Sequence, residues 1–416
     1  MSWPRVLLVA GLVAACTGGR GAEAPSGPVV ALVGGRVQAA PDVAAIDDGV
    51  VLIEGGRIRA VGRRGEVAIP TGALSLDCAG ATVSAGFWNS HVHFTQPVWN
   101  DAGAAPAERL AEGLRAMLTS RGFVRVVDLG SYPPNTAALR RRVDSGEIAG
   151  PAILTAGGGL APAGGSPFYI RPAKLPELSS RDEAERMVTV MIGLGADAIK
   201  LFTGSYAERT TIVVMPVPIV RAATDEAHRR GRIVLAHPSN SAGARAALEG
   251  GVDVLAHTFP SEQDGPWDRA LPGQMRERGM GLIPTLKLWP YELQKFGLPA
   301  EAQQRLLGAG QAQLRAFAEA GGQVLFGTDV GYMTDYDPAD EYAYMQQAGL
   351  TYVQILAALT TAPAARFGLA ARTGRVAPGL DGDVTVVDGA PERDIRTLAR
   401  VRYALRGGRL IYDKTR

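Results

Sequence analysis

The chain has few cysteines and no excess of either charge. The first feature bears on disulfides, and the second on the kind of partner the protein can bind. Its 416 residues include two cysteines, Cys16 and Cys78. If Cys16 is set aside as part of an export signal, Cys78 is the only thiol, which excludes an intrachain disulfide. The 43 lysines and arginines nearly balance the 41 aspartates and glutamates, and the arginines are scattered. This balance argues against nucleic acid or an anionic surface as a partner.

The first apolar run is too short to cross a membrane. Residues 6–15 follow an arginine and have the length of the apolar region of a secretory signal. The run ends in Val13-Ala14-Ala15-Cys16, which resembles the lipobox of bacterial lipoproteins, in which the cysteine becomes the lipidated N-terminus. An ordinary signal peptide cut a few residues later, with Cys16 incidental, is the alternative. We expect a signal in residues 1–16, a tether in 17–28, and export to the cell envelope or periplasm with a lipid anchor at Cys16.

Short segments of alternating hydrophobicity lie near both ends of the chain. Between residues 29 and 80 they are broken by the glycine pairs Gly34-Gly35 and Gly55-Gly56, which are typical of hairpin turns. Residues 371–416 supply a matching set of segments. We predict a small antiparallel β-sandwich module that is built from both termini and clamps a central domain.

Residues 81–370 alternate strand-like runs with helical patterns, and the whole chain is long enough for a barrel of about 250 residues plus a module. This alternation predicts an α/β fold, a (β/α)8 TIM-type barrel, with an open doubly wound sheet as the alternative. Residues 339–367 are expected to form one long helical stretch that closes the barrel. The other expected helices include 181–192, 217–229 and 301–320, and the expected strands are 82–88, 124–129, 152–156, 198–202, 233–236, 254–256, 281–285 and 324–327.

Four of the five histidines mark the ends of these runs. His91 and His93 follow the first run one residue apart, and both imidazoles point to one side because side chains on a strand alternate faces. Barrels carry their chemistry at the carboxyl ends of the strands. Four further candidates lie at or just past those ends: Lys200, His237, His257 and Asp329.

Neutral imidazoles and a carboxylate suit Zn²⁺ and related ions, but a lysine ammonium would be repelled by a metal. Two nearby dications would depress the pKa of Lys200 from about 10.4. The neutral amine can then add CO₂ to give a carbamate whose oxygens bridge both ions. We therefore predict two divalent metal ions, zinc with manganese or cobalt as alternatives, and a CO₂-derived carbamate on Lys200.

These residues lie in an ordered set of motifs that resembles the amidohydrolase superfamily, most closely its binuclear imidazolonepropionase-like and prolidase-like branch. The motifs are Gly86-Phe87-Trp88-Asn89-Ser90-His91-Val92-His93, Gly195-Ala196-Asp197-Ala198-Ile199-Lys200-Leu201-Phe202, Leu235-Ala236-His237, Leu255-Ala256-His257 and Gly327-Thr328-Asp329-Val330-Gly331. The similarity extends to Thr360-Thr361-Ala362-Pro363-Ala364 and to residues 374–388.

The resemblance implies a role for each of the six residues. His91, His93 and Asp329 would hold the more buried ion, His237 and His257 the more exposed one, and carbamylated Lys200 would bridge them. It also implies that a hydroxide shared by the two ions attacks a carbonyl and that Asp329 passes its proton to the leaving nitrogen. Asn89 stands where relatives often have aspartate, which affects metal affinity rather than the chemistry.

Loops after the third, fourth and eighth expected strands offer candidates for a substrate pocket: Tyr169, Arg171, Tyr206 and Tyr332. Arg171 would bind a carboxylate, and aromatic packing of the loops is the alternative interpretation. Trp289, after the seventh strand, is open to the same two interpretations. His228 is expected on a charged helix surface, and Asp128 is expected to be a buried hydrogen-bonding group.

Together these features predict a hydrolase of an amide-type carbon–nitrogen bond in a small molecule, by preference a dipeptide or an N-acyl amino acid. The same ligands would serve for a lactone, a phosphotriester or a cyclic amide. A non-catalytic envelope binding lipoprotein is the remaining alternative, disfavoured because all six ligands are present. Barrels of this kind often pair as homo-oligomers, but the sequence contains no interface signature.

Overall fold

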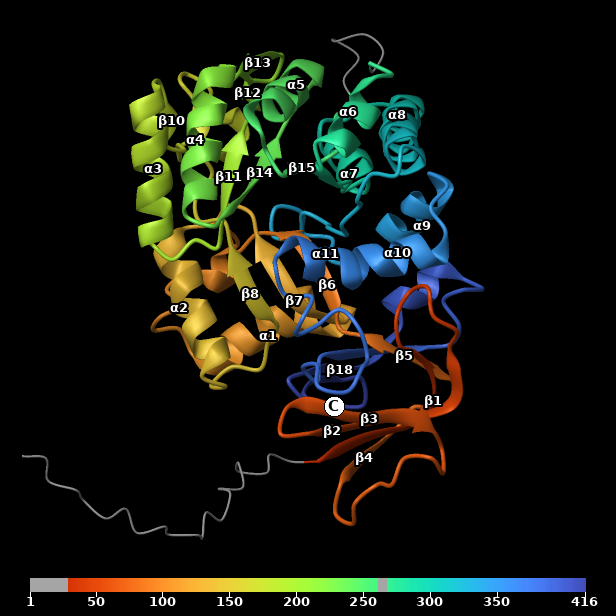
Figure 1. Ribbon diagram of the computed structural model, residues 1–416. Helices are drawn as coiled ribbons and strands as arrows, with labels where there is room; N and C mark the ends of the chain where they lie inside the picture. The colour runs from red at the N-terminus through yellow and green to blue at the C-terminus, as the bar shows by residue number, and fades with distance from the viewer. Residues whose placement is uncertain (1–28, 261–267) are drawn as a thin grey trace, which may run out of the picture.

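The computed structural model describes residues 29–260 and 268–416. It shows a TIM-barrel-type α/β region with a β-rich domain below it in the view of Figure 1. The expected signal, tether and lipidated Cys16 lie outside the described residues. Among the described residues, no helix has the length and apolar character needed to cross a bilayer.

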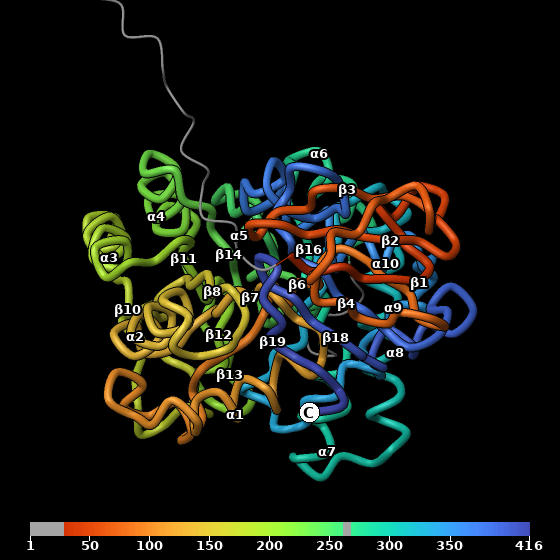
Figure 2. Tube along the Cα trace, turned by 90° about the horizontal axis from the view of Figure 1, so that it is seen from below, coloured from red at the N-terminus to blue at the C-terminus, as the bar shows by residue number. Residues whose placement is uncertain are grey.

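The β-rich domain is one hydrogen-bonded sheet of eight strands rather than two separate sheets, with the order β19-β18-β17-β5-β1-β2-β3 and β4 paired to β1. Segments from the two ends of the chain lie side by side in it (Figure 2), because β17 pairs with β5. The strands are β1 (Val30–Gln38), β2 (Ile46–Glu54), β3 (Arg57–Arg63), β4 (Leu74–Asp77), β5 (Ala81–Ala85), β17 (Val384–Asp388), β18 (Val401–Arg406) and β19 (Arg409–Asp413).

Two details of this domain differ from the sequence prediction. The sheet is mixed rather than antiparallel, since β1 pairs in parallel with both β4 and β5. The pair Gly55-Gly56 does form a hairpin between β2 and β3, whereas Gly34-Gly35 lies inside β1 at a register shift. Gly34 has φ +84°, a conformation that serves a β-bulge as well as a turn, so a glycine pair alone does not distinguish the two.

The predicted first barrel strand is divided between the two domains. Residues up to Ala85 belong to β5 in the terminal sheet, and the barrel begins with β6 (Phe87–Val92). The change occurs at Gly86, whose amide donates to the carbonyl of Asp383 at 2.9 Å. A Cβ at Gly86 would overlap the side chain of Val124, so only glycine lets the chain pass between the domains here.

The barrel strands run parallel in two groups, β6-β7-β8 and β11-β14-β15-β16. Backbone bridges between Leu160 and Leu201, Leu282 and Val324, and Val92 and Val330 connect these groups. The predicted eighth strand, 324–327, is not a regular strand and pairs only through such isolated bridges. The named strands are β7 (Phe123–Asp128), β8 (Ala152–Thr155), β11 (Ala198–Phe202), β14 (Ile233–His237), β15 (Val254–Ala256) and β16 (Gly281–Ile283).

Helices surround these strands (Figure 1). The predictions for 181–192, 217–229 and 301–320 are confirmed by α3 (Arg181–Gly193), α4 (Val217–Arg229) and α8 (Ala300–Glu319). The long stretch predicted over 339–367 is instead three helices, α9 (Ala339–Gln347), α10 (Tyr352–Leu359) and α11 (Thr361–Arg366). Gly349 has φ +101° between the first two, and Thr351 begins α10 with a capping box.

The remaining helices are α1 (Ala107–Met117), α2 (Pro133–Asp144), α5 (Ser241–Gly250), α6 (Leu271–Glu277) and α7 (Leu288–Lys295), with 3₁₀ turns at Pro97–Trp99, Thr119–Arg121, Phe168–Ile170 and Ile395–Ala399. Short strands also form in the loops after the third and fourth barrel strands. They are β9 (Ala161–Pro162), β10 (Glu177–Leu178), β12 (Gly204–Glu208) and β13 (Thr211–Val214).

A buried ion-pair network joins the two domains. Arg125 on β7 lies 2.6 Å from Asp383 Oδ2 through Nε and 3.1 Å from Asp381 Oδ2 through a terminal nitrogen. The second oxygen of Asp383 accepts the backbone amide of Gly407 at 2.8 Å. Both carboxylates are almost fully covered; Asp381 also pairs with Arg372 at 2.9 Å, whereas Asp383 depends on the guanidinium of Arg125 to balance its charge.

Arg125→Met should therefore lower the free energy of unfolding by about 3–5 kcal/mol, since it leaves the buried carboxylate of Asp383 without its ion-pair partner. Urea denaturation followed by circular dichroism measures the change. Arg59→Met is the matched control, because the Arg59 side chain is 73% exposed and pairs only at 3.8 Å; this change should stay within about 0.5 kcal/mol. Equal stability of the two variants would contradict the assigned role of Arg125.

Candidate metal centre

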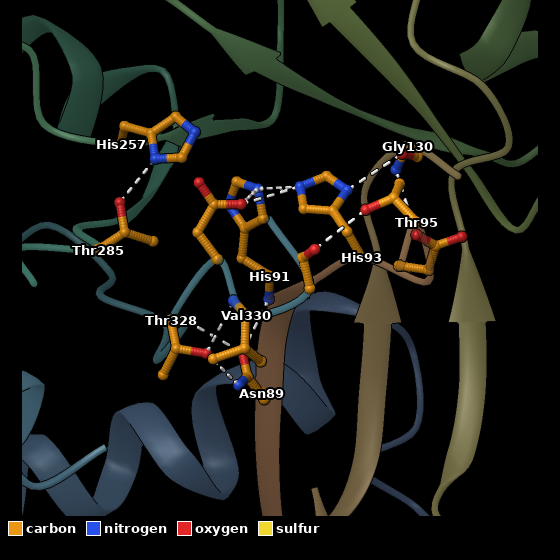
Figure 3. Close-up of polar contacts among 12 residues, drawn as sticks. Asn89, His91, His93, Thr95, Gly130, His257, Thr285, Thr328 and Val330 are labelled. Atoms are coloured by element: carbon orange, nitrogen blue, oxygen red, sulfur yellow. Dashed lines mark hydrogen bonds and ion pairs between the residues drawn. The ribbon is translucent and has the colours of Figure 1, made fainter. Parts of the chain in front are cut away.

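Three side chains predicted from the sequence meet at one point at the carboxyl end of β6. The Nε2 atoms of His91 and His93 lie 3.2 Å apart, and Asp329 Oδ1 lies 3.3 Å from the first and 2.9 Å from the second. His91 and His93 point toward one another in Figure 3. Among the described residues, these three form the group whose ligand atoms are close enough together to hold one ion.

The spacing of the three atoms fits a metal ion. Ligands at about 2.0–2.1 Å around a tetrahedral ion lie about 3.3 Å from one another. The separations found here are 3.2, 3.3 and 2.9 Å. His93 Nδ1 lies 3.1 Å from the carbonyl of Gly130, which can only accept a hydrogen bond, so Nδ1 carries the proton. In the neutral ring, Nε2 then presents a lone pair toward Asp329, and a positive charge between the two groups is required.

A second pair of imidazoles lies beside the first. The ring centroid of His257 is 4.6 Å from that of His91 and 4.7 Å from that of His237. Thr285 Oγ1 donates to the carbonyl of Pro284 at 2.9 Å, so it accepts from His257 Nδ1 at 2.6 Å. This relay leaves Nε2 of His257 unprotonated, as a metal ligand must be.

Lys200 completes the predicted set of six. Lys200 lies on β11, which pairs with the strand β14 that carries His237. Phe202 is opposite His237 in this pairing, and Lys200, two residues before Phe202, is on the same face of the sheet. The side chain is 1% exposed. Burial lowers the pKa of Lys200 to about 8, against the opposing effect of the Asp329 carboxylate.

The electrostatics favour neutral imidazoles. Burial, followed by the charge of Lys200, lowers the pKa of His91 and of His237 well below the usual value, and burial with the neighbouring His237 does the same for His257. For His93, burial lowers the pKa, but the hydrogen bond and charge of Asp329 outweigh it and raise the pKa overall. A positive charge between His93 and Asp329 is thus favoured, and so is the neutral form of the other three rings, which is the form in which an imidazole can bind a metal.

Two of the candidate ligands occupy backbone conformations that non-glycine residues rarely adopt: Asp329 has φ +63° and His257 has φ +89°. Such conformations persist where the surroundings force them and cluster at functional sites. Around Asp329, the loop is positioned by Gly331, at φ +99°, where a Cβ would overlap the backbone carbonyl of His93.

Asn89, the residue that departs from the common pattern, connects the two halves of the first ligand group. Its Nδ2 donates to Thr328 Oγ1 at 2.6 Å, and its Oδ1 accepts the backbone amides of His91 and Thr328 at 3.2 Å each. Asn89 therefore holds the turn that precedes Asp329 against β6 without touching a ligand side chain.

Two structural assignments made from the sequence are confirmed. Asp128 is buried and accepts hydrogen bonds from Ser131 at 2.6 Å and Thr155 at 3.0 Å. His228 is exposed on α4 and lies 2.8 Å from Asp253, far along the strands from the ligands.

The candidate substrate residues lie in different settings. The rings of Tyr169 and Tyr332 are in contact, with centroids 5.6 Å apart, and burial followed by the charge of Asp329 raises the pKa of Tyr169. Tyr206 is close enough to affect the same pKa.

Arg171 is exposed and bonds to Glu208 at 2.6 Å. Trp289 Nε1 donates to Thr258 at 2.9 Å, next to His257.

Sequence reasoning missed two kinds of functional neighbour. Thr285 is the last residue of the seventh expected strand, and residues at that end of a barrel strand lie at the active-site face, so the sequence could have indicated it. Glu292 lies on α7, among ordinary charged helix residues, and had no signal; the structure brings it beside Tyr332 and close enough to Asp329 to be affected by its charge.

A candidate metal-ligand set at the carboxyl ends of a TIM-barrel-type sheet is the arrangement typical of metal-dependent barrel hydrolases. The model of the Amidohydrolase family matches residues 82–411, so this chain belongs to the amidohydrolase family. Members are typically metal-dependent, and the enzyme is a hydrolase acting on carbon–nitrogen bonds.

The chain is 26% identical to the ochratoxinase of Aspergillus niger over 370 residues, which cover 78% of this chain and 74% of that protein. A putative prolidase from Bifidobacterium longum is 26% identical with a TM-score of 0.78, over 92% of this chain and 95% of that one. A prolidase complexed with N-methylphosphonate-L-proline is also 26% identical, with a TM-score of 0.77 over 93% of this chain and 100% of that one.

Gly331→Ala should remove metal from the first ligand group, because the new methyl group must displace the carbonyl of His93. Elemental analysis after dialysis should find at least one equivalent of divalent metal less per chain than in the wild type. Gly231→Ala is the control, since Gly231 also has a positive φ, +69°, but no atom lies within 4 Å of the added Cβ. Wild-type metal content in Gly331→Ala would contradict the assigned role of this loop.

Proposed function

We propose that this hydrolase cleaves the amide bond of a dipeptide or an N-acyl amino acid, using two divalent ions and a carbamate on Lys200. The observation that carries the proposal is the convergence of His91, His93 and Asp329 within 3.3 Å at a buried point, with the other predicted ligands beside it. The relatives named prolidases, one of them bound to a phosphonate derivative of proline, support an amide formed by an amino acid.

The donor set fits two ions. His91, His93 and Asp329 would hold one, and His237 and His257 the other. When bound, the ions would supply a hydroxide at neutral pH and polarise the carbonyl of the substrate. A lysine ammonium among four imidazoles would oppose this arrangement, whereas a carbamate on Lys200 would present one negative charge shared by two oxygens.

The protein groups then position the reaction and move the proton. Asp329 is 4% exposed and adjoins both His91 and His93, so its carboxylate can take the proton of the attacking water and deliver it to the leaving nitrogen. Burial of the ligands excludes bulk water, which strengthens each charge interaction in the site. The relays from His93 to Gly130 and from His257 to Thr285 keep both rings in one tautomer.

Lys200→Ala should reduce bound metal from about two equivalents to one or fewer and abolish most amide hydrolysis, with partial recovery when a short-chain carboxylic acid such as propionate is added. Elemental analysis and an amidase assay measure both effects. Lys174→Ala, at an exposed position, is the control and should behave like the wild type. Two equivalents of metal in Lys200→Ala would exclude the bridging carbamate.

A substrate panel tests the reaction itself. Zinc-, manganese- and cobalt-loaded protein should hydrolyse dipeptides or N-acyl amino acids faster than lactones or phosphotriesters. Turnover confined to lactones or phosphotriesters would replace the proposal with that reaction, and no turnover of any of these compounds would reject it.

We further propose that the protein is exported and lipid-anchored at Cys16, on the basis of the apolar run and the Val13-Ala14-Ala15-Cys16 motif. Cys16→Ser should move the full-length protein from the membrane fraction to the soluble fraction of lysed cells. Cys78→Ala is the control and should remain with the membranes, because Cys78 is buried in the β-rich domain. Membrane retention of Cys16→Ser would exclude this anchor.

A further inference from the structure

Four side chains from three loops form a cluster at the rim of the metal centre, here called the rim cluster: Tyr169, Glu292, Lys295 and Tyr332. Tyr169 follows the third strand, Glu292 and Lys295 lie on α7 after the seventh, and Tyr332 is three residues beyond Asp329. The rings of Tyr169 and Tyr332 are in contact, and the hydroxyl of Tyr332 donates to the carboxylate of Glu292.

The inner charge of this cluster is the carboxylate. The side chain of Glu292 is 14% exposed, whereas that of Lys295 is 51% exposed. Their N···O distance is 3.4 Å, longer than the 2.7–2.9 Å or so of a well-formed charge-assisted hydrogen bond. Lys295 is thus an outer and loosely held counterion, and a ligand can replace it.

The Lys295 ammonium lies among three groups that each attract a cation. Its Nζ lies 3.5 Å from the hydroxyl of Tyr332 and 5.0 Å from the centre of the Tyr332 ring, in addition to its approach to Glu292. A carboxylate, a hydroxyl oxygen and an aromatic face together attract a cation. The lysine of the protein stands where a cationic group of a ligand would find the same three partners.

The rim cluster lies near the candidate metal centre, since Tyr332 is three residues beyond Asp329 and its ring contacts that of Tyr169. The charges of Glu292 and of Asp329 both act on Tyr169, and Asp329 also acts on Glu292 itself. Burial raises the pKa of Glu292, against the charge of Lys295 and the Tyr332 hydrogen bond, so its ionised form gains from any additional cation. Arg171, the other candidate for a charge contact with substrate, is exposed and engaged with Glu208.

We propose that Glu292 and Tyr332 form a subsite for a cationic group of the substrate, an ammonium or a guanidinium, and that the enzyme therefore prefers positively charged amides. The inference rests on the proposed amide hydrolysis and adds the charge of its substrate. The metal ligands act on the amide alone and do not distinguish a charged from a neutral neighbour, so Glu292 is a specificity residue rather than a catalytic one.

Two substrate pairs test the preference and separate its two sources. Met-Ala against N-acetyl-Met-Ala reports on the α-ammonium, and Ala-Lys against Ala-norleucine reports on a basic side chain. In Glu292→Gln, kcat/KM for the charged member of at least one pair should fall about 10- to 100-fold, mainly through KM, while the neutral member changes less than about threefold. Glu301→Gln, at an exposed position on α8, is the control and should alter neither member.

Lys295→Met is the complementary variant. It removes the internal cation, so KM for the charged substrate should fall rather than rise. If Glu292→Gln and Lys295→Met impair charged and neutral substrates alike, the rim cluster is only structural and the proposal is wrong.

A binding measurement separates failure of this inference from failure of the proposed function. Calorimetry with n-butylammonium and the uncharged n-butanol requires no turnover. The wild type should bind the cation several-fold more tightly than the alcohol, and Glu292→Gln should lose this difference. Equal binding of the two probes by the wild type overturns the cation subsite even if amides are hydrolysed.

Discussion

The site depends on holding electron-rich atoms closer together than they would stay unaided. The Nε2 atoms of His91 and His93 and one oxygen of Asp329 lie within 3.3 Å of one another in a buried position. In a low-dielectric interior, these groups repel unless a cation or a proton lies between them. The surrounding protein imposes the arrangement through positive φ values and tight glycine packing, as at Gly331, where a Cβ would overlap the carbonyl of His93.

The β-rich domain contributes to this rigidity from the opposite end of the strands. The chain enters β6 directly from β5 of the terminal sheet, through Gly86. The neighbouring strand β7 is fixed to the same domain by Arg125 and its two aspartates. Two strands of the barrel are therefore anchored at their amino ends, and one of them, β6, contains His91 and is followed directly by His93.

In the proposed mechanism, the residues at the strand ends act in catalysis and the residues of the rim cluster recognise the substrate. The candidate ligands on β6, β14 and the loop around Asp329 would suit any carbonyl that reached bound ions. Discrimination must come from the longer loops, where Tyr169, Glu292 and Tyr332 meet. This division is common among barrels, whose loops vary while the strand ends retain the chemistry.

The sequence by itself determined the parallel α/β alternation, the two-ended sheet and the histidines at the strand ends. These features follow from local rules: side chains alternate on strands, helices repeat every 3.6 residues, and carboxyl ends of parallel strands meet at one edge. Only the tertiary structure decided that the chain changes domain at Gly86, that Gly34 belongs to a bulge, and that Glu292 faces Tyr332. Each of these depends on the approach of segments distant in sequence, and local periodicity contains no information about which segments approach.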